Sequence, residues 1–380
     1  MIFLKCALCD VEITKDNDTK EHIIPNAIGG RRKIKGFICR ACNSSSGDSW
    51  DKELAKQLNN LSLFFGIKRE RGNVPPELIE TTAGDRFSLN VDGSMTIEKP
   101  IYSEIPSQGN DSVQINITAR DINEAKNILK GVKRKYPQVD TDHFLDNLKI
   151  QSYYCSDMLK FDMSFGGHEA GRSIVKSALA LAVSSGIPSK ICTEAINYLK
   201  NEASEACFGY FYESDLIKNR PEGIPLHCVS IKGCSKNKQV IAYVEYFGMR
   251  RMVLCLSSSY TGEEVVNTYA INPVTGGTLE LTVELNLTYD EIHEVYEYKK
   301  IPIGSVERAC EKVIPAGMRA SYEKEQNRVV DKALQNAFEN CGAKEGEMLM
   351  SKNIEKIISI LLEEIEPFVL HNMSQSHSRD

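Results

Sequence analysis

Four cysteines near the start of the chain have the residue type and spacing of a metal site. Cys6 and Cys9 form one Cys-x-x-Cys pair, and Cys39 and Cys42 form a second pair. Two such pairs bring four soft thiolates together from tight turns, as a tetrahedral zinc site requires. A redox dithiol or two disulfides are the alternatives, but neither pair lies in a βαβ pattern and the first residues lack a secretory pattern. The sequence therefore predicts structural Zn²⁺.

Between the two cysteine pairs lies a segment with the pattern of a hairpin. It contains an acidic residue directly before a histidine, Glu21-His22, among strand-forming residues. Asn43 follows the second cysteine pair. The elements that this pattern predicts are a strand at 19–25, a glycine turn at 29–30, a second strand at 33–38 and a helix beginning near residue 48. Zinc would join the base of the hairpin to the helix.

These motifs resemble the HNH endonucleases of the ββα-metal fold, in the version that is stapled by zinc. That version carries Cys-x-x-Cys, an acidic residue followed by His-Ile-x-Pro, a Gly-Gly turn and Cys-x-x-Cys-Asn, and all of these occur here in order. The resemblance covers residues 1–60. It implies an enzyme that hydrolyses phosphodiester bonds in DNA and needs Mg²⁺ or Mn²⁺ in addition to Zn²⁺.

The resemblance also assigns roles to three residues. His22 would take a proton from water, a role that neutral imidazole suits near pH 7. Glu21 and Asn43 would supply oxygen ligands to one Mg²⁺ or Mn²⁺ ion, which stabilises charge on the phosphorane and on the leaving oxygen. Adjacent residues of a regular strand point to opposite faces, so Glu21 and His22 must lie at a strand end to serve one site.

The sequence departs from the family's pattern around the hairpin. An Asn on the hairpin often positions the catalytic His, but residues 31–37 contain none, and Asn26 can serve only if its loop folds back. Where some relatives carry a further His or Asn, one helical turn after Asn43, this chain has Gly47 with Asp48 beside it. Asp48 is expected to cap the helix. Metal binding is its alternative role.

Basic side chains gather beside the predicted site, although the whole chain is acidic. The formal net charge is −6, whereas residues 1–75 hold 13 Lys and Arg against 9 Asp and Glu. No acidic residue occurs between His22 and Asp48. Cations at this place can neutralise phosphates and give salt-sensitive binding. The predicted nucleic-acid contacts are Arg31, Arg32, Lys33, Lys35 and Arg40.

The rest of the chain predicts an α+β protein with more than one domain, as its 380 residues allow. Strand-like runs broken by turn residues at 226–287 predict an antiparallel meander. Two C-terminal helices are predicted, at 320–340 and 354–371, and the second has an apolar helical pattern. The predicted division is an HNH module with the zinc site at 1–66, a linker and hairpin at 67–100, a mixed α+β regulatory or substrate-recognition domain at 101–371, and a disordered tail at 372–380.

Composition and apolar patterning favour a cytoplasmic protein. No apolar run approaches the ~18 residues of a membrane helix, so no membrane is expected as a partner. The cysteines outside the two pairs are scattered singly, as buried thiols are in a reducing cell. The last helix has a broad apolar face that can complete the core or join two subunits as a homodimer.

The expected function is a metal-dependent HNH endonuclease acting on DNA, whose C-terminal domain controls specificity or activation through a small-molecule or protein regulator. By resemblance, HNH modules occur in restriction enzymes, homing endonucleases and anti-phage effectors, so restriction or anti-phage defence is a further hypothesis. One alternative is a non-catalytic zinc module that binds DNA or a protein. Another is a nuclease held inactive until the C-terminal domain binds a ligand or oligomerises.

Overall fold

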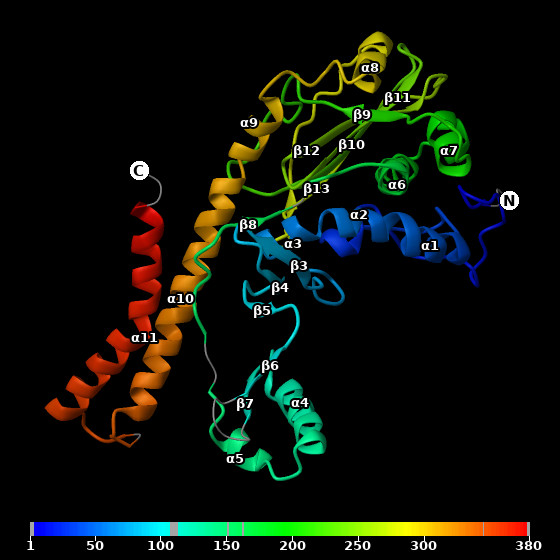
Figure 1. The fold of residues 1–380 in the computed structure, drawn as a ribbon. Coiled ribbons are helices and arrows are strands. Elements are labelled where there is room, and N and C mark those ends of the chain that lie inside the picture. The colour runs from blue at the N-terminus through cyan, green and yellow to red at the C-terminus, as the bar shows by residue number, and fades with distance from the viewer. Residues whose placement is uncertain (1–3, 107–112, 150–151, 162, 345, 378–380) are drawn as a thin grey trace. The chain divides into compact units, whose positions relative to one another are not determined.

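A computed structural model describes residues 4–106, 113–149, 152–161, 163–344 and 346–377. The chain falls into two units, Met1–Pro75 with Asp162–Ala320 and Pro76–Phe161 with Ser321–Asp380 (Figure 1). These units cut across the predicted division, because residues 101–371 contribute to both. The predicted HNH segment shares its unit with residues 162–320, since a buried helix from that range packs directly against it.

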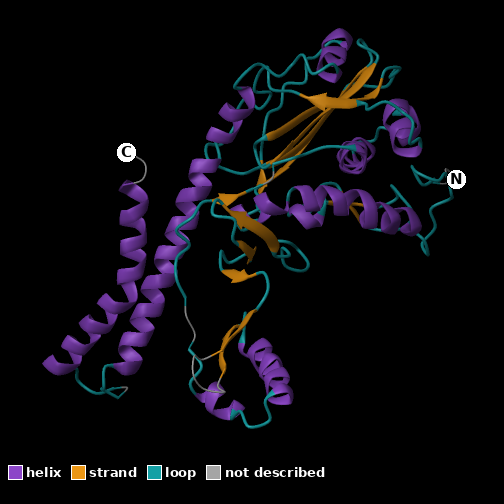
Figure 2. Cartoon of the chain, in the orientation of Figure 1, coloured by secondary structure: helices purple, strands orange, loops and turns teal. Residues whose placement is uncertain are grey.

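The first unit is built on a six-stranded antiparallel sheet of order β14-β13-β10-β11-β12-β9. Figure 2 shows the strands of the protein in orange. Consecutive strands β10, β11 and β12 pair as the expected meander, but β13 returns to pair with β10. The free edge of β12 is taken by β9, a strand that the sequence pattern did not indicate. The strands are β9 Phe208–Tyr210, β10 His227–Cys234, β11 Gln239–Tyr246, β12 Arg250–Ser257, β13 Val265–Ile271 and β14 Thr278–Leu279.

Helix α6, His168–Ser184, lies between this sheet and the N-terminal helices. Its residues from Ala170 to Ala182 are buried, because one side packs on β10 to β13 and the other on η2 and α2. A helix enclosed on both sides is apolar nearly all round. The N-terminal helical elements are α1 Arg40–Ser46, the π-helical turn η2 Gly47–Asp51, α2 Lys52–Gln57 and α3 Asn59–Phe65.

Helix α8, Tyr289–Tyr296, contributes to a hydrophobic core on the sheet. Ile292 and Val295 of this helix pack with buried Tyr243 and Val253. The other short elements of this unit are α7 Thr193–Lys200, α9 Ser305–Glu311 and the 3-10 turn η3 Ser189–Ile191.

The second unit contains a four-stranded antiparallel sheet of order β5-β4-β3-β8 and a separate hairpin, β6-β7. The helix α4 begins after Asp121, whose side chain accepts the N–H of Glu124 as an N-cap does. The elements are β3 Glu77–Thr81, β4 Arg86–Leu89, β5 Met95–Ile97, β6 Ile101–Pro106, β7 Val113–Thr118, α4 Ile122–Lys135, α5 Thr141–Asp146 and β8 Leu159–Lys160.

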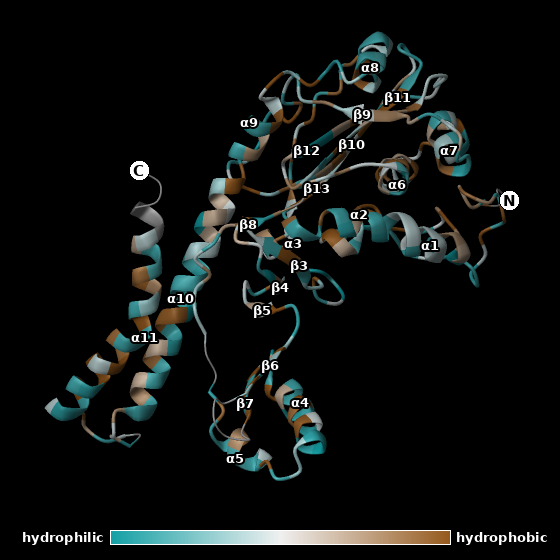
Figure 3. Ribbon diagram, viewed as in Figure 1, coloured by the Kyte–Doolittle hydropathy of each residue, from teal (hydrophilic) through white to brown (hydrophobic). Residues whose placement is uncertain are grey.

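Both predicted C-terminal helices are present and longer than expected. Helix α10 spans Ile314–Asn340 and α11 spans Ser351–His377. Figure 3 shows hydrophobic and hydrophilic patches alternating along them, as in amphipathic helices. Residues 372–377 of the predicted disordered tail are helical because α11 continues through them, and residues 378–380 lie outside the described part of the chain. Among the described residues, no helix has the length and apolar content to cross a membrane.

Candidate nuclease site

The N-terminal segment has the predicted order of two strands followed by a helix. Strands β1, Glu21–His22, and β2, Lys33–Ile34, pair antiparallel, with His22 opposite Lys33. They are shorter than expected. Helix α1 begins at Arg40, which corrects the expected start near residue 48, because Cys39 is the N-cap and the second cysteine pair forms the first turn.

The two glycines of the hairpin loop are required by its backbone. The loop turns through η1, Asn26–Ile28, and ends at Gly29 in the left-handed region with φ 95°. At Gly30 a Cβ atom would lie 1.8 Å from the carbonyl oxygen of Ile24. Side chains are therefore excluded at Gly30 by contact and disfavoured at Gly29 by conformation.

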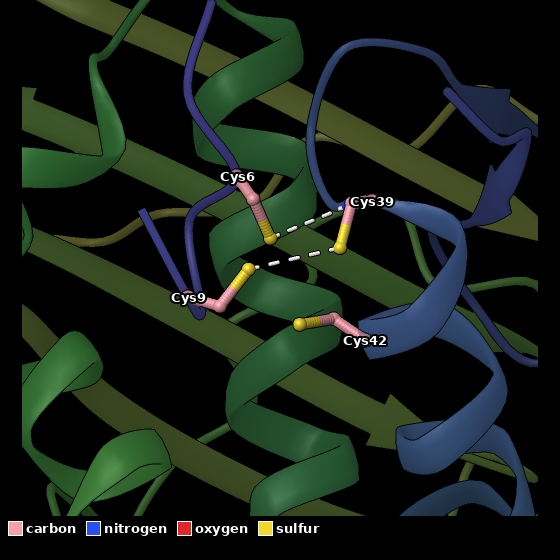
Figure 4. Close-up of side chains that lie close together, drawn as sticks. All are labelled: Cys6, Cys9, Cys39 and Cys42. Atoms are coloured by element: carbon pink, nitrogen blue, oxygen red, sulfur yellow. Dashed lines mark hydrogen bonds between the residues drawn. The ribbon is translucent and has the colours of Figure 1, made fainter. Parts of the chain in front are cut away.

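The four cysteines converge as predicted. Their Sγ atoms all lie within 4.8 Å of one another, and those of Cys9 and Cys39 are 3.7 Å apart (Figure 4). Zn–S bonds of tetrahedral geometry place sulfur atoms about 3.8 Å apart. Burial opposes ionisation of the Cys6 thiol, but hydrogen bonds from backbone N–H groups, that of Cys39 first, lower its pKa to about 7. The donor set fits Zn²⁺, held by Cys6, Cys9, Cys39 and Cys42.

The imidazole of His22 is held by a residue from the connector that follows α3. Nε2 of His22 lies 3.0 Å from Oε2 of Glu70, and the same oxygen accepts a hydrogen bond from Lys33 at 2.6 Å. The loop that carries Asn26 folds back toward the site, which was the condition for Asn26 to position His22. Its side chain holds the backbone at Glu70 and Arg71, however, and not the imidazole. Its Oδ1 accepts the N–H of Glu70 at 2.9 Å, and its Nδ2 donates to the carbonyl of Arg71 at 3.2 Å.

Burial favours a neutral imidazole at His22, and the contact with Glu70 defines its tautomer. Hydrogen bonds from Lys33 and then from His22 lower the pKa of Glu70 to about 2, so its carboxylate only accepts. Nε2 of His22 therefore carries the proton, and the lone pair is on Nδ1. Burial lowers the pKa of His22 below its usual 6.5, partly offset by Glu70. At pH 7 this imidazole can accept a proton.

The zinc knuckles, the hairpin and the histidine with its adjacent acid now stand together in one folded segment. Residues 6–59 match the HNH endonuclease family. This segment, called the HNH module below, accounts for a small part of the chain. No curated protein and no solved structure matches the chain.

Within the HNH module, Glu21 points away from His22 and into the protein. Its side chain is 6% exposed, and Oε1 lies 2.6 Å from Nζ of Lys176 in α6. The same ammonium lies 2.6 Å from Oδ2 of Asp51 and 3.4 Å from Oγ of Ser46. Burial raises the pKa of Glu21, against the opposing attraction of Lys176. Burial would lower the pKa of Lys176, but Asp51 and Glu21 outweigh it and raise that pKa.

The expected catalytic ion does not fit these residues as they stand. A divalent ion on Glu21 would lie beside the Lys176 ammonium, and at a separation of about 4 Å the two would repel by about 8 kcal/mol at an effective dielectric constant of about 20. In the described part of the chain, the cysteine cluster alone gathers three or more His, Cys, Asp or Glu ligand atoms. No step of the chemistry is therefore assigned to an ion at Glu21.

The other two expected ligands do not approach such an ion either. Asn43 lies on α1, and its Nδ2 donates to Oγ1 of Thr19 at 2.7 Å. Asp48 is exposed within η2, in the middle of a continuous helical run, so it does not begin a helix as expected. The expected roles of Asn43 and Asp48 both assumed that the helix begins after Asn43, whereas α1 begins before it, at Arg40.

The five predicted phosphate contacts divide into two groups. Arg32, Lys35 and Arg40 are exposed. Lys33 is half-buried and paired with Glu70, and Arg31 is half-buried against the loop at Gly276. The first group is the more exposed one, so it is the group more available to a phosphate backbone.

Sequence reasoning missed two charged residues that define the site, Glu70 and Lys176. Glu70 lies in a basic connector, and no spacing rule links it to His22. The sequence does indicate that Lys176 has a special role, because it is the one lysine within the apolar run of α6. A charge in such a place needs a buried counter-charge, which Glu21 and Asp51 supply.

Proposed function

We propose that the HNH module hydrolyses phosphodiester bonds in DNA, with His22 as the general base. Nδ1 of His22 takes the proton from the attacking water, and Glu70 holds the ring through Nε2 and stabilises the imidazolium that forms. The pairing of His22 with an ionised Glu70 carries this proposal, because it supplies a neutral, oriented base at neutral pH. Zn²⁺ on the four cysteines would have a structural role and join the N-terminal loop to α1.

Exposed cations beside the hairpin would bind the substrate. Arg32, Lys35 and Arg40 reach solvent from the segment between His22 and the end of the second cysteine pair. Lys33 lies opposite His22 in the hairpin, and through its ion pair it holds Glu70 in place. Phosphate contacts from such residues position a nucleic acid without selecting its sequence.

The test is nicking of supercoiled plasmid by the zinc-loaded full-length protein, with and without added Mg²⁺ or Mn²⁺. His22→Ala is expected to lower the rate by about 10²- to 10⁴-fold, the usual contribution of a general base. His293→Ala removes an exposed histidine of α8 and is expected to match wild type. Equal nicking by wild type and His22→Ala would contradict the proposed role of His22.

Binding of DNA without cleavage is the second candidate function. The observation that favours it is the buried ammonium of Lys176 on Glu21, the residue expected to hold the catalytic ion. If this candidate is correct, wild type and His22→Ala shift a labelled duplex equally and neither nicks plasmid.

Residues outside the HNH module would select the substrate or control activity, in the setting of restriction or anti-phage defence. Self-association through the C-terminal helices is one such control. Ile354, Ile358 and Leu362 recur every fourth residue on α11 and are 47%, 51% and 66% exposed. A second copy of the chain would cover this stripe, and light scattering of wild type and Leu362→Glu would detect the loss of a dimer.

A further inference from the structure

The Glu21 carboxylate of the HNH module already has a cation, and the chain itself supplies it. Lys176 comes from α6, outside the matched residues 6–59. Its ammonium has three protons to donate, and three acceptors surround it, namely the carboxylates of Glu21 and Asp51 and the hydroxyl of Ser46. We propose that Lys176 is the resident cation of this site, so that the zinc-loaded protein takes no divalent ion at Glu21.

Burial and contacts support this assignment. The Lys176 side chain is 1% exposed, and both ion-pair distances are 2.6 Å. The second oxygen of Asp51 accepts the hydroxyl of Ser173 at 2.6 Å, so that carboxylate is fixed as well. One ammonium thus joins β1, η2 and α6, which is the cross-linking that a bound metal ion would otherwise provide.

Removing the ammonium leaves the buried carboxylate of Glu21 and the half-buried carboxylate of Asp51 without a counter-charge. Such a pair is strongly destabilising unless a cation replaces the lost one. Lys176→Met keeps most of the side-chain volume and removes the charge, so it should create a site for a hard divalent ion with Glu21 and Asp51 as oxygen ligands. Ion binding would then stabilise the folded variant.

Electron paramagnetic resonance of Mn²⁺ measures this directly with zinc-loaded full-length protein at equal protein and Mn²⁺ concentrations. Wild type is expected to leave Mn²⁺ free, and Lys176→Met is expected to bind one Mn²⁺ per chain. That site should disappear when Glu21→Gln is added. The melting temperature of Lys176→Met should rise with Mn²⁺, while that of wild type stays constant.

Arg172→Met is the matched control, because Arg172 is another buried cation of α6, one turn earlier. It faces Trp50 and Glu169 rather than Glu21, so its loss should create no Mn²⁺ site. The proposal is overturned if wild type binds one Mn²⁺ that Glu21→Gln abolishes, or if folded Lys176→Met binds none. Should Lys176→Met not fold, the comparison of wild type with Glu21→Gln still decides, because unchanged free Mn²⁺ in both supports the proposal.

This inference deepens the proposed function of the same site. The test of this inference measures ion binding, whereas the test of the proposed function measures cleavage, so either one can fail without the other. A nuclease with Lys176 in this place would nick plasmid without added Mg²⁺ or Mn²⁺. Wild-type cleavage that needs no Mn²⁺ and is lost in His22→Ala would support both the proposed function and the assignment of Lys176. Mn²⁺-dependent cleavage with Mn²⁺ bound at Glu21 would support the proposed function and contradict the assignment of Lys176.

Discussion

Oε2 of Glu70 lies 3.0 Å from Nε2 of His22, across 48 positions of sequence. An ionised carboxylate behind an imidazole fixes the ring and its tautomer, and raises the basicity of the opposite nitrogen. Glu70 is itself fixed by Lys33 and by Asn26. The connector after α3 is therefore part of the candidate site.

Replacing Glu70 with Gln should lower the cleavage rate and move its pH dependence. The folded pKa of His22 lies below 6.5, so the rate should rise with pH to a plateau, with the midpoint of the rise below pH 6.5, as the imidazole loses its proton. Glu70 raises that pKa, and without its charge the rise should move to lower pH. The plateau should fall because a weaker, less oriented base remains. The measurement is the nicking rate between pH 5 and pH 8.

A matched carboxylate change separates this effect from general loss of charge. Glu12→Gln removes an exposed carboxylate of the HNH module and should follow the wild-type profile. A Glu70→Gln profile that overlays wild type would show that Glu70 does not position His22.

Loss of zinc should unfold the start of the HNH module. Structural zinc sites bind with about 10–16 kcal/mol, and much of that free energy stabilises the fold. Cys39→Ser removes a buried ligand at the N-cap of α1, and should reduce zinc from one ion per chain to none and lower the melting temperature. Zinc analysis and circular dichroism measure both.

Cys234→Ser is the control, since it removes a half-buried cysteine of β10 that lies outside the cluster. It should retain zinc. Retention of zinc by Cys39→Ser would exclude the four-thiolate site. Zinc binding should also weaken as pH falls, because the cysteine thiols must lose their protons to the solvent before they bind as thiolates.

A buried histidine should make the stability of the first unit depend on pH. Nε2 of His227 donates to the carbonyl of Ile28 at 2.8 Å, and Nδ1 accepts the N–H of Phe247 at 3.0 Å. Burial lowers the pKa of His227 to about 4. The unfolded chain takes up this proton near pH 6.5, so stability present above that pH is lost as pH falls toward 4, by about 3 kcal/mol in total.

Urea unfolding at pH 7.5, 6 and 5 measures this loss. His227→Gln should be less stable than wild type at pH 7.5 but should lose less stability on acidification. His293→Gln, on the surface of α8, should parallel wild type. Equal losses in wild type and His227→Gln would show that His227 does not carry the effect. The zinc ligands are the same in all three proteins, so the comparison isolates the histidine.

The sequence predicts the local motifs of the site well because their spacing is set by chemistry. The cysteine pairs, the acid-His pair and the glycine turn each follow from what a knuckle, a base and a tight loop need. The partners of His22 and Glu21 come from distant segments, and no local rule specifies them. The fold of the connector brings Glu70 to His22, and the packing of α6 between the sheet and the helical elements η2 and α2 brings Lys176 to Glu21.

The same limit applies to larger elements. The broad apolar face of 354–371 predicts α11, because a helix that buries one face shows it in its own residues. Strand order depends on pairing between segments, so the return of β13 to β10 and the edge position of β9 could not be predicted. The predicted helix start near residue 48 was wrong because acidic residues suggested a cap there, whereas Cys39 is the N-cap of a helix that begins at Arg40.

Exposed cations beside the hairpin should set the salt dependence of DNA binding. Arg32, Lys35 and Arg40 face solvent, whereas Lys33 is held by Glu70. Each phosphate contact releases counterions and contributes about 0.9 to the slope of log K against log salt concentration. Replacing all three with Gln should reduce the slope by about 3 and weaken binding to any DNA sequence alike. Fluorescence anisotropy of a labelled duplex across a salt series measures the slope.

The control for this triple variant has the same change of charge elsewhere. Lys126, Lys130 and Lys133 are exposed on α4, and their replacement with Gln should leave the slope near that of wild type. An equal reduction in both triple variants would show that net charge, rather than these three side chains, governs binding. A slope reduced only in the hairpin variant would place the phosphate backbone beside His22, because the exposed cations and the general base belong to the same hairpin and the helix that follows it.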